Sequence, residues 1–119
     1  MILITEEKIE SGSKAIAKKL KGVYRYEKDS FKDLAYKYCS GAILYGVGVD
    51  ETIDLNYLAE RAYDGWREAF YEFQWTWGEE LAEDVYSDLL EKEYASLPKD
   101  EQEKYQAMVT AILDMLSTR

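Results

Sequence analysis

The chain of 119 residues contains no histidine, a single cysteine and a single proline. The absence of histidine excludes Ser–His and Cys–His nucleophile pairs, His-bound zinc and histidine pH switches. A lone cysteine, Cys39, excludes a disulfide framework and a cysteine-rich zinc site. No run of about 18 apolar residues occurs, so the sequence predicts no membrane span. The start turns acidic at Glu6 and Glu7 without a basic region, so we expect no signal peptide and a cytoplasmic protein.

The net charge of −9 is unevenly distributed along the chain. Residues 1–50 carry nine Lys or Arg and seven Asp or Glu, whereas residues 51–119 carry six and seventeen. A protein that binds duplex nucleic acid needs a basic face, so we expect no direct binding to nucleic acid. A partner with a basic surface would fit the acidic half, but an acidic composition can also serve solubility alone.

Periodicity and capping residues predict a mainly α, compact single domain of about five helices with at most short β-strands. The helices are expected near residues 6–21, 30–45, 54–73, 79–93 and 98–117. Short stretches of β-formers near 23–26 and 74–77 favour the extended conformation.

The expected helix ends depend on a few residues. Thr5 begins the first helix and Gly22 ends it, while Asp29 or Ser30 begins the second. Gly46 and Gly48 end the second helix, since Gly46-Val47-Gly48 lacks the lysine of a phosphate-binding loop. Asp54 caps the third helix, and Pro98 opens the last one at its first turn, where its missing N–H costs nothing.

The third helix has the clearest pattern, with an apolar stripe and an acidic stripe on roughly opposite sides. The apolar stripe includes Trp66, which is therefore expected in the core. The acidic stripe follows i, i+4 spacing and comprises Glu60, Asp64, Glu68 and Glu72. A solvated charged face is favoured there over a metal site. The acidic run 79–84, with Asp88 one turn on, lacks the second ExxE-type pair that a magnesium site needs, so no metal ligand is assigned.

Eleven tyrosines and three tryptophans are many for a core of this size. Buried Tyr and Trp need partners for their polar tips, so some are expected at a boundary, lining a pocket or anchoring an interface. In an extended turn, Trp75 and Trp77 would point to the same side and share a small cleft. The plain alternative is that Trp66, Trp75 and Trp77 form the main core. Cys39 lies in an apolar stretch and is interpreted as a small core residue.

Three segments resemble the RyR domain, the repeat named after the ryanodine receptor and also found as small single-domain proteins of bacteria and phages. They are residues 58–66 (LAERAYDGW), 75–78 (WTWG) and 94–105 (YASLPKDEQEKY). The matching positions are Trp66, Trp75, Trp77, Gly78, Leu97, Pro98, Glu101 and Gln102. The resemblance implies one RyR-like domain over residues 1–119, with leading helices in 1–46 and the motif-bearing part in 47–117.

The sequence departs from the family pattern at three places. Tyr63 stands where the family has a histidine, and Gln74 stands where it has a glycine before the second tryptophan. Residues 83–90 replace a lysine- and histidine-bearing segment. If that segment touches a ligand in relatives, this chain has lost the ligand or changed it.

The resemblance implies a non-enzymatic binding module with no catalytic residue, metal or cofactor. The ligand expected from it is a small nucleotide-derived molecule, stacked on an aromatic shelf of Trp66, Trp75 and Tyr63, with Trp77 beside it. Arg61 or Arg67 would then meet a phosphate. The alternative is an acidic phage or bacterial interaction or inhibitor protein that docks on a basic partner surface. The sequence also leaves a homodimer open.

Overall fold

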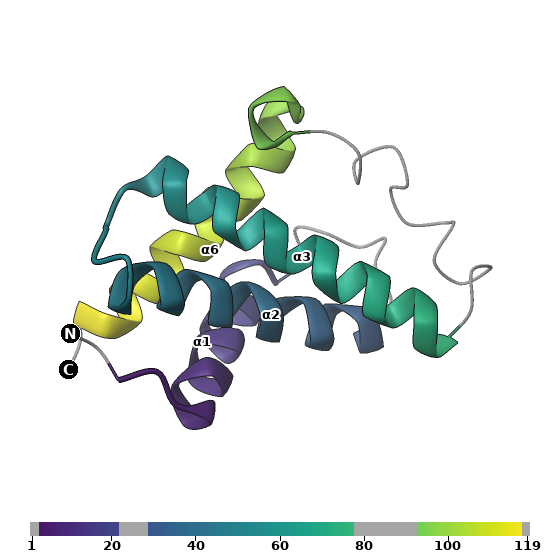
Figure 1. The fold of residues 1–119 in the computed structure, drawn as a ribbon, viewed down its shortest axis with the longest axis horizontal. Helices are drawn as coiled ribbons and strands as arrows, with labels where there is room; N and C mark the ends of the chain where they lie inside the picture. The colour runs from purple at the N-terminus through teal and green to yellow at the C-terminus, as the bar shows by residue number, and fades with distance from the viewer. Residues whose placement is uncertain (1–2, 22–28, 78–92, 118–119) are drawn as a thin grey trace.

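The computed structural model describes residues 3–21, 29–77 and 93–117, which form four α-helices and a short 3₁₀ helix (Figure 1). In chain order these are α1 (Glu6–Lys19), α2 (Asp29–Gly48), α3 (Leu55–Trp77), η1 (Tyr94–Ser96) and α6 (Lys99–Ser117). None of the described residues belongs to a strand. The radius of gyration, 13.6 Å, matches the value of about 13.5 Å expected for a compact domain of this length. The expected mainly helical single domain is thus confirmed.

The capping residues predicted for two helices act as expected. The Thr5 hydroxyl accepts a hydrogen bond from the backbone N–H of Lys8 at 3.1 Å and begins α1. An Asp54 carboxylate oxygen accepts one from the N–H of Tyr57 at 2.8 Å and begins α3. Each bond satisfies a backbone donor that the first turn of a helix leaves without an internal partner. The first helix ends at Lys19, slightly before the expected bound.

The second helix runs past the expected end near residue 45 and continues to Gly48. Gly46 is buried inside it, and a Cβ atom there would lie 2.6 Å from Cδ2 of Leu58 on α3. Gly46 therefore permits close packing of two helices and is not a helix stop. The left-handed residue of the connection to α3 is Glu51, with φ of 53°.

The prediction of a short strand near 74–77 is wrong, because α3 remains helical through Trp77. Extending an existing helix adds one hydrogen bond for each residue fixed, and this outweighs the weak β-preference of aromatic residues. The strand expected near 23–26 and the helix expected near 79–93 lie outside the described residues.

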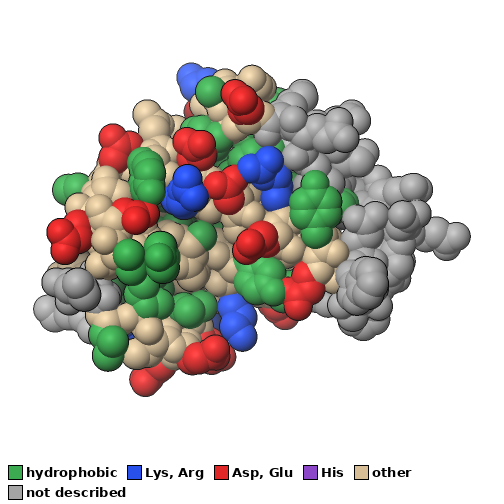
Figure 2. Space-filling model, in the orientation of Figure 1, with side chains coloured by type: hydrophobic (Ala, Val, Ile, Leu, Met, Phe, Trp, Pro, Cys, Tyr) green, Lys and Arg blue, Asp and Glu red, His purple; other side chains and the backbone are tan. Residues whose placement is uncertain are grey.

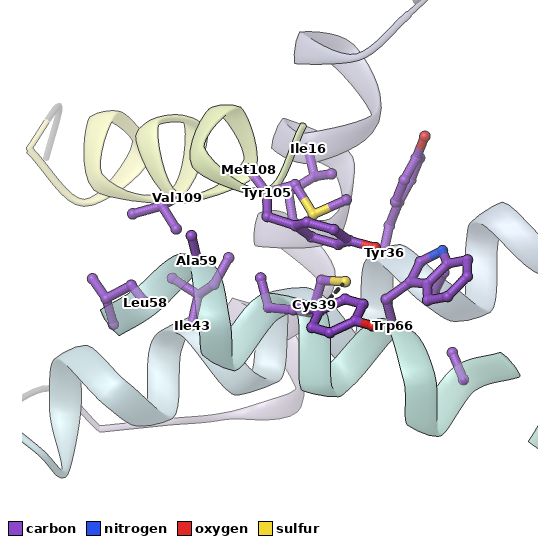
Figure 3. Close-up of a cluster of buried hydrophobic side chains, with 14 of the residues drawn as sticks. Ile16, Tyr36, Cys39, Ile43, Leu58, Ala59, Trp66, Tyr105, Met108 and Val109 are labelled. Carbon is purple, nitrogen blue, oxygen red and sulfur yellow. Dashed lines mark hydrogen bonds between the residues drawn. The ribbon is translucent and has the colours of Figure 1, made fainter. Parts of the chain in front are cut away.

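The helices α2 and α3 lie side by side, and α6 and α1 pack against them (Figure 1). Figure 3 shows side chains of all four helices meeting in one core, among them Ile16, Ile43, Leu58, Trp66 and Met108. Each of these five is at most 1% exposed. In the part of the chain described, no helix combines the length and apolar character needed to cross a membrane.

Candidate functional site

Trp66, the first of the expected shelf residues, lies in the core. Its side chain is 1% exposed and makes an edge-to-face contact with Phe31, the ring centroids being 5.7 Å apart. The Phe70 ring lies 5.8 Å from it. An indole so enclosed offers no accessible face for a stacked base, so the core interpretation of Trp66 is the one that the structure supports.

The other notable neighbour of Trp66 is a buried ammonium group from α6. Nζ of Lys104 lies 5.1 Å from the Trp66 ring centroid and 4.8 Å from the Tyr105 ring centroid. It also forms an ion pair with Glu101 at 3.0 Å, and both residues are buried. Cation–π contact and a carboxylate together offset the cost of removing the ammonium from water. The face of the Trp66 ring is therefore already in contact with the ammonium group of Lys104.

Tyr63, which is only 1% exposed, and both expected arginines lie close to Asp64 on α3. The Arg67 guanidinium lies 4.5 Å from the Tyr63 ring centroid and forms an ion pair with Asp64. The Arg61 guanidinium lies 5.3 Å from the Tyr57 ring centroid and 3.7 Å from the other Asp64 oxygen. The i, i+3 spacing on one helix brings these groups together.

Burial and the contacts with Asp64 shift the pKa values of Tyr63 and Arg67. Burial raises the pKa of the Tyr63 hydroxyl, because the phenolate would be poorly solvated. Burial lowers the pKa of Arg67, but the hydrogen bond and the charge of Asp64 outweigh it, and the net pKa is raised. Arg67 therefore remains a cation that is already engaged by a carboxylate.

A cavity of about 310 Å³ opens beside Tyr63 and Arg67, between α3 and η1. The lining residues are Glu60, Tyr63, Asp64, Arg67, Glu93, Tyr94 and Ala95. Three carboxylates thus face one guanidinium, and the local charge is negative. Such a lining repels a phosphate and favours a basic group.

The η1 wall of this cavity is held by Gln102 of α6. Its side-chain amide donates to the backbone carbonyls of Tyr94, Ala95 and Leu97 at 3.1, 3.3 and 3.1 Å. The Tyr94 hydroxyl accepts a hydrogen bond from the Gln106 amide at 3.2 Å. The Tyr94 carbonyl also accepts from the Leu97 N–H at 3.1 Å within the turn, and the Gln102 amide adds bonds that join η1 to α6, so the wall has a defined position.

The side chains of Trp75 and Trp77 lie outside what the structure describes, so their place in the site stays a prediction. The α3 backbone is helical at both positions. Residues two apart in a helix are separated by about 200° around the axis. The premise that both point to the same side of an extended turn is therefore wrong.

Comparisons with protein-family models, with curated proteins and with solved structures give no match. The resemblance to the RyR domain therefore stays a prediction from the motif residues.

Among the described residues, no group of three or more acidic or cysteine side chains has the arrangement of a metal site. The acidic run 79–84 and Asp88 lie outside those residues. Cys39 is fully buried, and its thiol donates to the Ala62 carbonyl at 3.2 Å, so the expected core role is confirmed.

Sequence reasoning missed the cavity's η1 wall and the buried Lys104–Glu101 pair. Glu93 and Tyr94 are 26 and 27 residues beyond Arg67 in sequence, and periodicity carries no information on such a contact. For Lys104 a signal existed: it precedes Tyr105 and follows Glu101 by one helical turn, a spacing that permits an ion pair.

Proposed function

We propose that this chain is a binding module whose acidic α3 face docks on a basic surface of a partner protein. The observation that carries the proposal is the row of carboxylates at Glu60, Asp64, Glu68 and Glu72, which reach the surface one turn apart. The row spans 13 residues, from Glu60 to Glu72, and its ends lie about 18 Å apart along the helix. Figure 2 shows acidic side chains spread over the molecular face on which α3 lies, with basic side chains between them.

Ion pairing among the described residues leaves most of this row uncompensated. Arg61 and Arg67 both pair with Asp64. Of the ion pairs found in the described ranges, none includes Glu60, Glu68 or Glu72. Like charges at i, i+4 destabilise a helix by about 0.2–0.5 kcal/mol per pair, and a cationic partner would remove this cost.

The cavity beside Tyr63 extends the acidic surface beyond α3. Glu60 belongs both to the row and to the cavity lining, and Glu93 adds a carboxylate from the opposite wall. A lysine or arginine side chain of the partner that enters here would meet carboxylates from two directions. This supports docking on a basic partner.

A nucleotide-derived ligand is the second candidate, and one observation favours it. Arg67 lines the cavity together with Tyr63 and Tyr94, a combination that can meet a phosphate and a ring. The carboxylates of Glu60 and Glu93 line the same cavity and would repel a phosphate there. The basic partner is therefore our first choice.

Kinship with the RyR domain is also proposed, with a binding module as its consequence. What supports it is that the LPKDEQ segment forms a coherent structural unit. Leu97 is buried, Pro98 immediately precedes α6, and Gln102 holds η1. These roles give a physical reason for such a pattern at these positions.

The test is a calorimetric titration with an oligolysine peptide at low and at physiological ionic strength. Exposed ion pairs contribute about 0.2–1 kcal/mol each. The triple variant Glu60→Gln/Glu68→Gln/Glu72→Gln should therefore raise Kd about tenfold. The matched control, Glu6→Gln/Glu7→Gln/Glu10→Gln on α1, changes the net charge by the same amount and should have a much smaller effect.

Two results would contradict the proposal. Equal weakening by both triple variants would assign the binding to bulk charge and not to the α3 face. An absence of heat with oligolysine at low salt, combined with binding of an adenine nucleotide that Arg67→Ala weakens, would favour the second candidate.

A further inference from the structure

The connection from α2 to α3 exposes an unusual amount of apolar surface. Tyr45, Val49, Ile53 and Leu55 are 55%, 50%, 77% and 41% exposed. We call these four residues the turn patch. They account for four of the six large hydrophobic side chains that the described ranges expose. Figure 1 places this connection at one end of the α2–α3 pair, and Figure 2 shows apolar side chains gathered on that end of the visible face.

Several hydrogen bonds hold the turn patch in place. The Val49 N–H donates to the Tyr45 carbonyl at 2.8 Å and continues the helical pattern at the end of α2. The Tyr57 hydroxyl of α3 donates to an Asp50 carboxylate oxygen at 2.6 Å and joins the connection to α3. On the α3 side, the Asp54 N–H donates to the Thr52 hydroxyl at 3.1 Å, so bonds flank Ile53. An apolar surface that is already ordered loses little conformational entropy when a partner covers it.

The charged residues of the connection itself are all acidic. Residues 38–60 contain no lysine and no arginine, whereas Asp50, Glu51, Asp54 and Glu60 lie within them. The carboxylates at 50, 51 and 54 alternate with the patch residues along the chain and are exposed. Arg61 lies close by, 5.3 Å from the Tyr57 ring centroid, but it pairs with Asp64, so carboxylates predominate beside the patch. An ordered apolar patch with such neighbours is complementary to a helix with one apolar face and basic flanks.

We propose that the turn patch binds the apolar face of a basic amphipathic helix of a partner protein. This inference rests on the proposed function and adds the apolar contact to it. Glu60, the first carboxylate of the acidic row, lies five residues beyond Leu55 on α3, about 7.5 Å along the helix and about 140° around it. The partner's basic flank would then extend along α3 while its apolar side chains cover Ile53 and its neighbours.

A second copy of this chain is a poorer occupant of the turn patch. In a two-fold symmetric contact the same patch faces itself. The carboxylates of Asp50, Glu51 and Asp54 would then face their own copies. The whole-chain charge of −9 adds to this repulsion.

The experiment uses a synthetic peptide in which leucine and lysine are arranged as an amphipathic helix. A peptide of the same composition, permuted so that the apolar face is lost, is the reference ligand. We expect the amphipathic peptide to bind more tightly than the permuted one and more tightly than oligolysine. Binding is measured by calorimetry, and the contact is mapped by amide chemical shifts.

Two variants test the contact residue by residue. Ile53→Ser lies outside both helices and should raise Kd for the amphipathic peptide about tenfold, which corresponds to about 1.4 kcal/mol. Tyr45→Ser should weaken binding in the same direction. Leu3→Ser is the control for an exposed apolar side chain outside the turn patch, because Leu3 is 74% exposed and precedes α1. It should change Kd by less than about twofold.

The outcomes separate this inference from the proposed function. Tight peptide binding that Ile53→Ser and Tyr45→Ser leave unchanged would overturn the turn patch, while oligolysine binding could still support the acidic face. Peptide binding that needs Ile53 but not the α3 carboxylates would keep the turn patch and contradict the α3 docking face. Self-association of the free chain that Ile53→Ser abolishes would assign the patch to a second copy and overturn the inference.

Discussion

Substitution of Gly65 by alanine should have the opposite effect on stability to the one that helix propensity predicts. Gly65 is inside α3, where alanine is preferred over glycine by about 0.8–1.0 kcal/mol. However, a Cβ atom there would lie 2.8 Å from the Tyr38 carbonyl oxygen and 3.2 Å from Cα of Cys39. Both obstacles belong to the α2 backbone, so no side-chain rotation relieves them, and the two helices would have to separate. Overpacking of this kind costs about 1–3 kcal/mol. Because the obstacles are backbone atoms, the upper part of this range, about 2–3 kcal/mol, applies. After the propensity gain of about 1 kcal/mol is subtracted, Gly65→Ala should lower the free energy of unfolding by about 1–2 kcal/mol.

The assay is urea unfolding followed by circular dichroism, with Gly41→Ala as the matched control. Gly41 is inside α2, and the nearest atoms to its added Cβ would be two Ile9 side-chain carbons at 3.8 and 4.0 Å. Those are ordinary contacts, so Gly41→Ala should stabilise the protein by up to about 1 kcal/mol. The reasoning would be refuted if Gly65→Ala were as stable as the parent protein or more stable, or if both variants shifted stability in the same direction.

Two further predictions concern the core. Trp66→Ala should lower the free energy of unfolding by about 3–5 kcal/mol, since the side chain is 1% exposed and contacts Phe31. A loss below about 1 kcal/mol in urea unfolding would contradict the core role of Trp66. Alkaline pH should destabilise the fold, because burial raises the pKa of Tyr63 and Tyr94 above the ordinary value of 10.0. The folded state favours the neutral phenols, so their contribution is present below pH 10 and is lost as pH rises through the folded-state pKa values. Unfolding free energies measured across this range should decline less steeply for Tyr63→Phe, and an unchanged slope would count against the argument.

The sequence was most informative where a structural signal is local. The starts of α1 and α3 depend on Thr5 and Asp54, whose side chains bond N–H groups three residues away. Trp66 could be assigned to the core because helical spacing places it on the apolar side of α3. Such signals need only one element of structure.

The failures come from contacts between elements. Gly46 looked like a helix stop, because the sequence does not show that Leu58 lies against it. The segment 74–77 looked extended, because local preference does not include the gain from continuing α3. Glu93 and Tyr94 come to the candidate cavity only through the packing of η1, which depends on Gln102. None of these can be derived from periodicity.

The residues that carry the resemblance to the RyR domain have structural roles wherever the structure describes their side chains. Trp66 is enclosed in the core, Glu101 pairs with Lys104, and Gln102 bonds three backbone carbonyls. A substitution at such a position would disturb packing before it changed any ligand. A match at such motif residues therefore bears on the architecture of the domain, whereas ligand specificity depends on the residues that line the site. In the cavity the charged residues are chiefly Glu60, Asp64 and Glu93, and Tyr63, at the position where the RyR-domain pattern has a histidine, lies beside them. A likeness of fold would thus be compatible with a change of ligand, from a phosphate-bearing molecule to a basic partner.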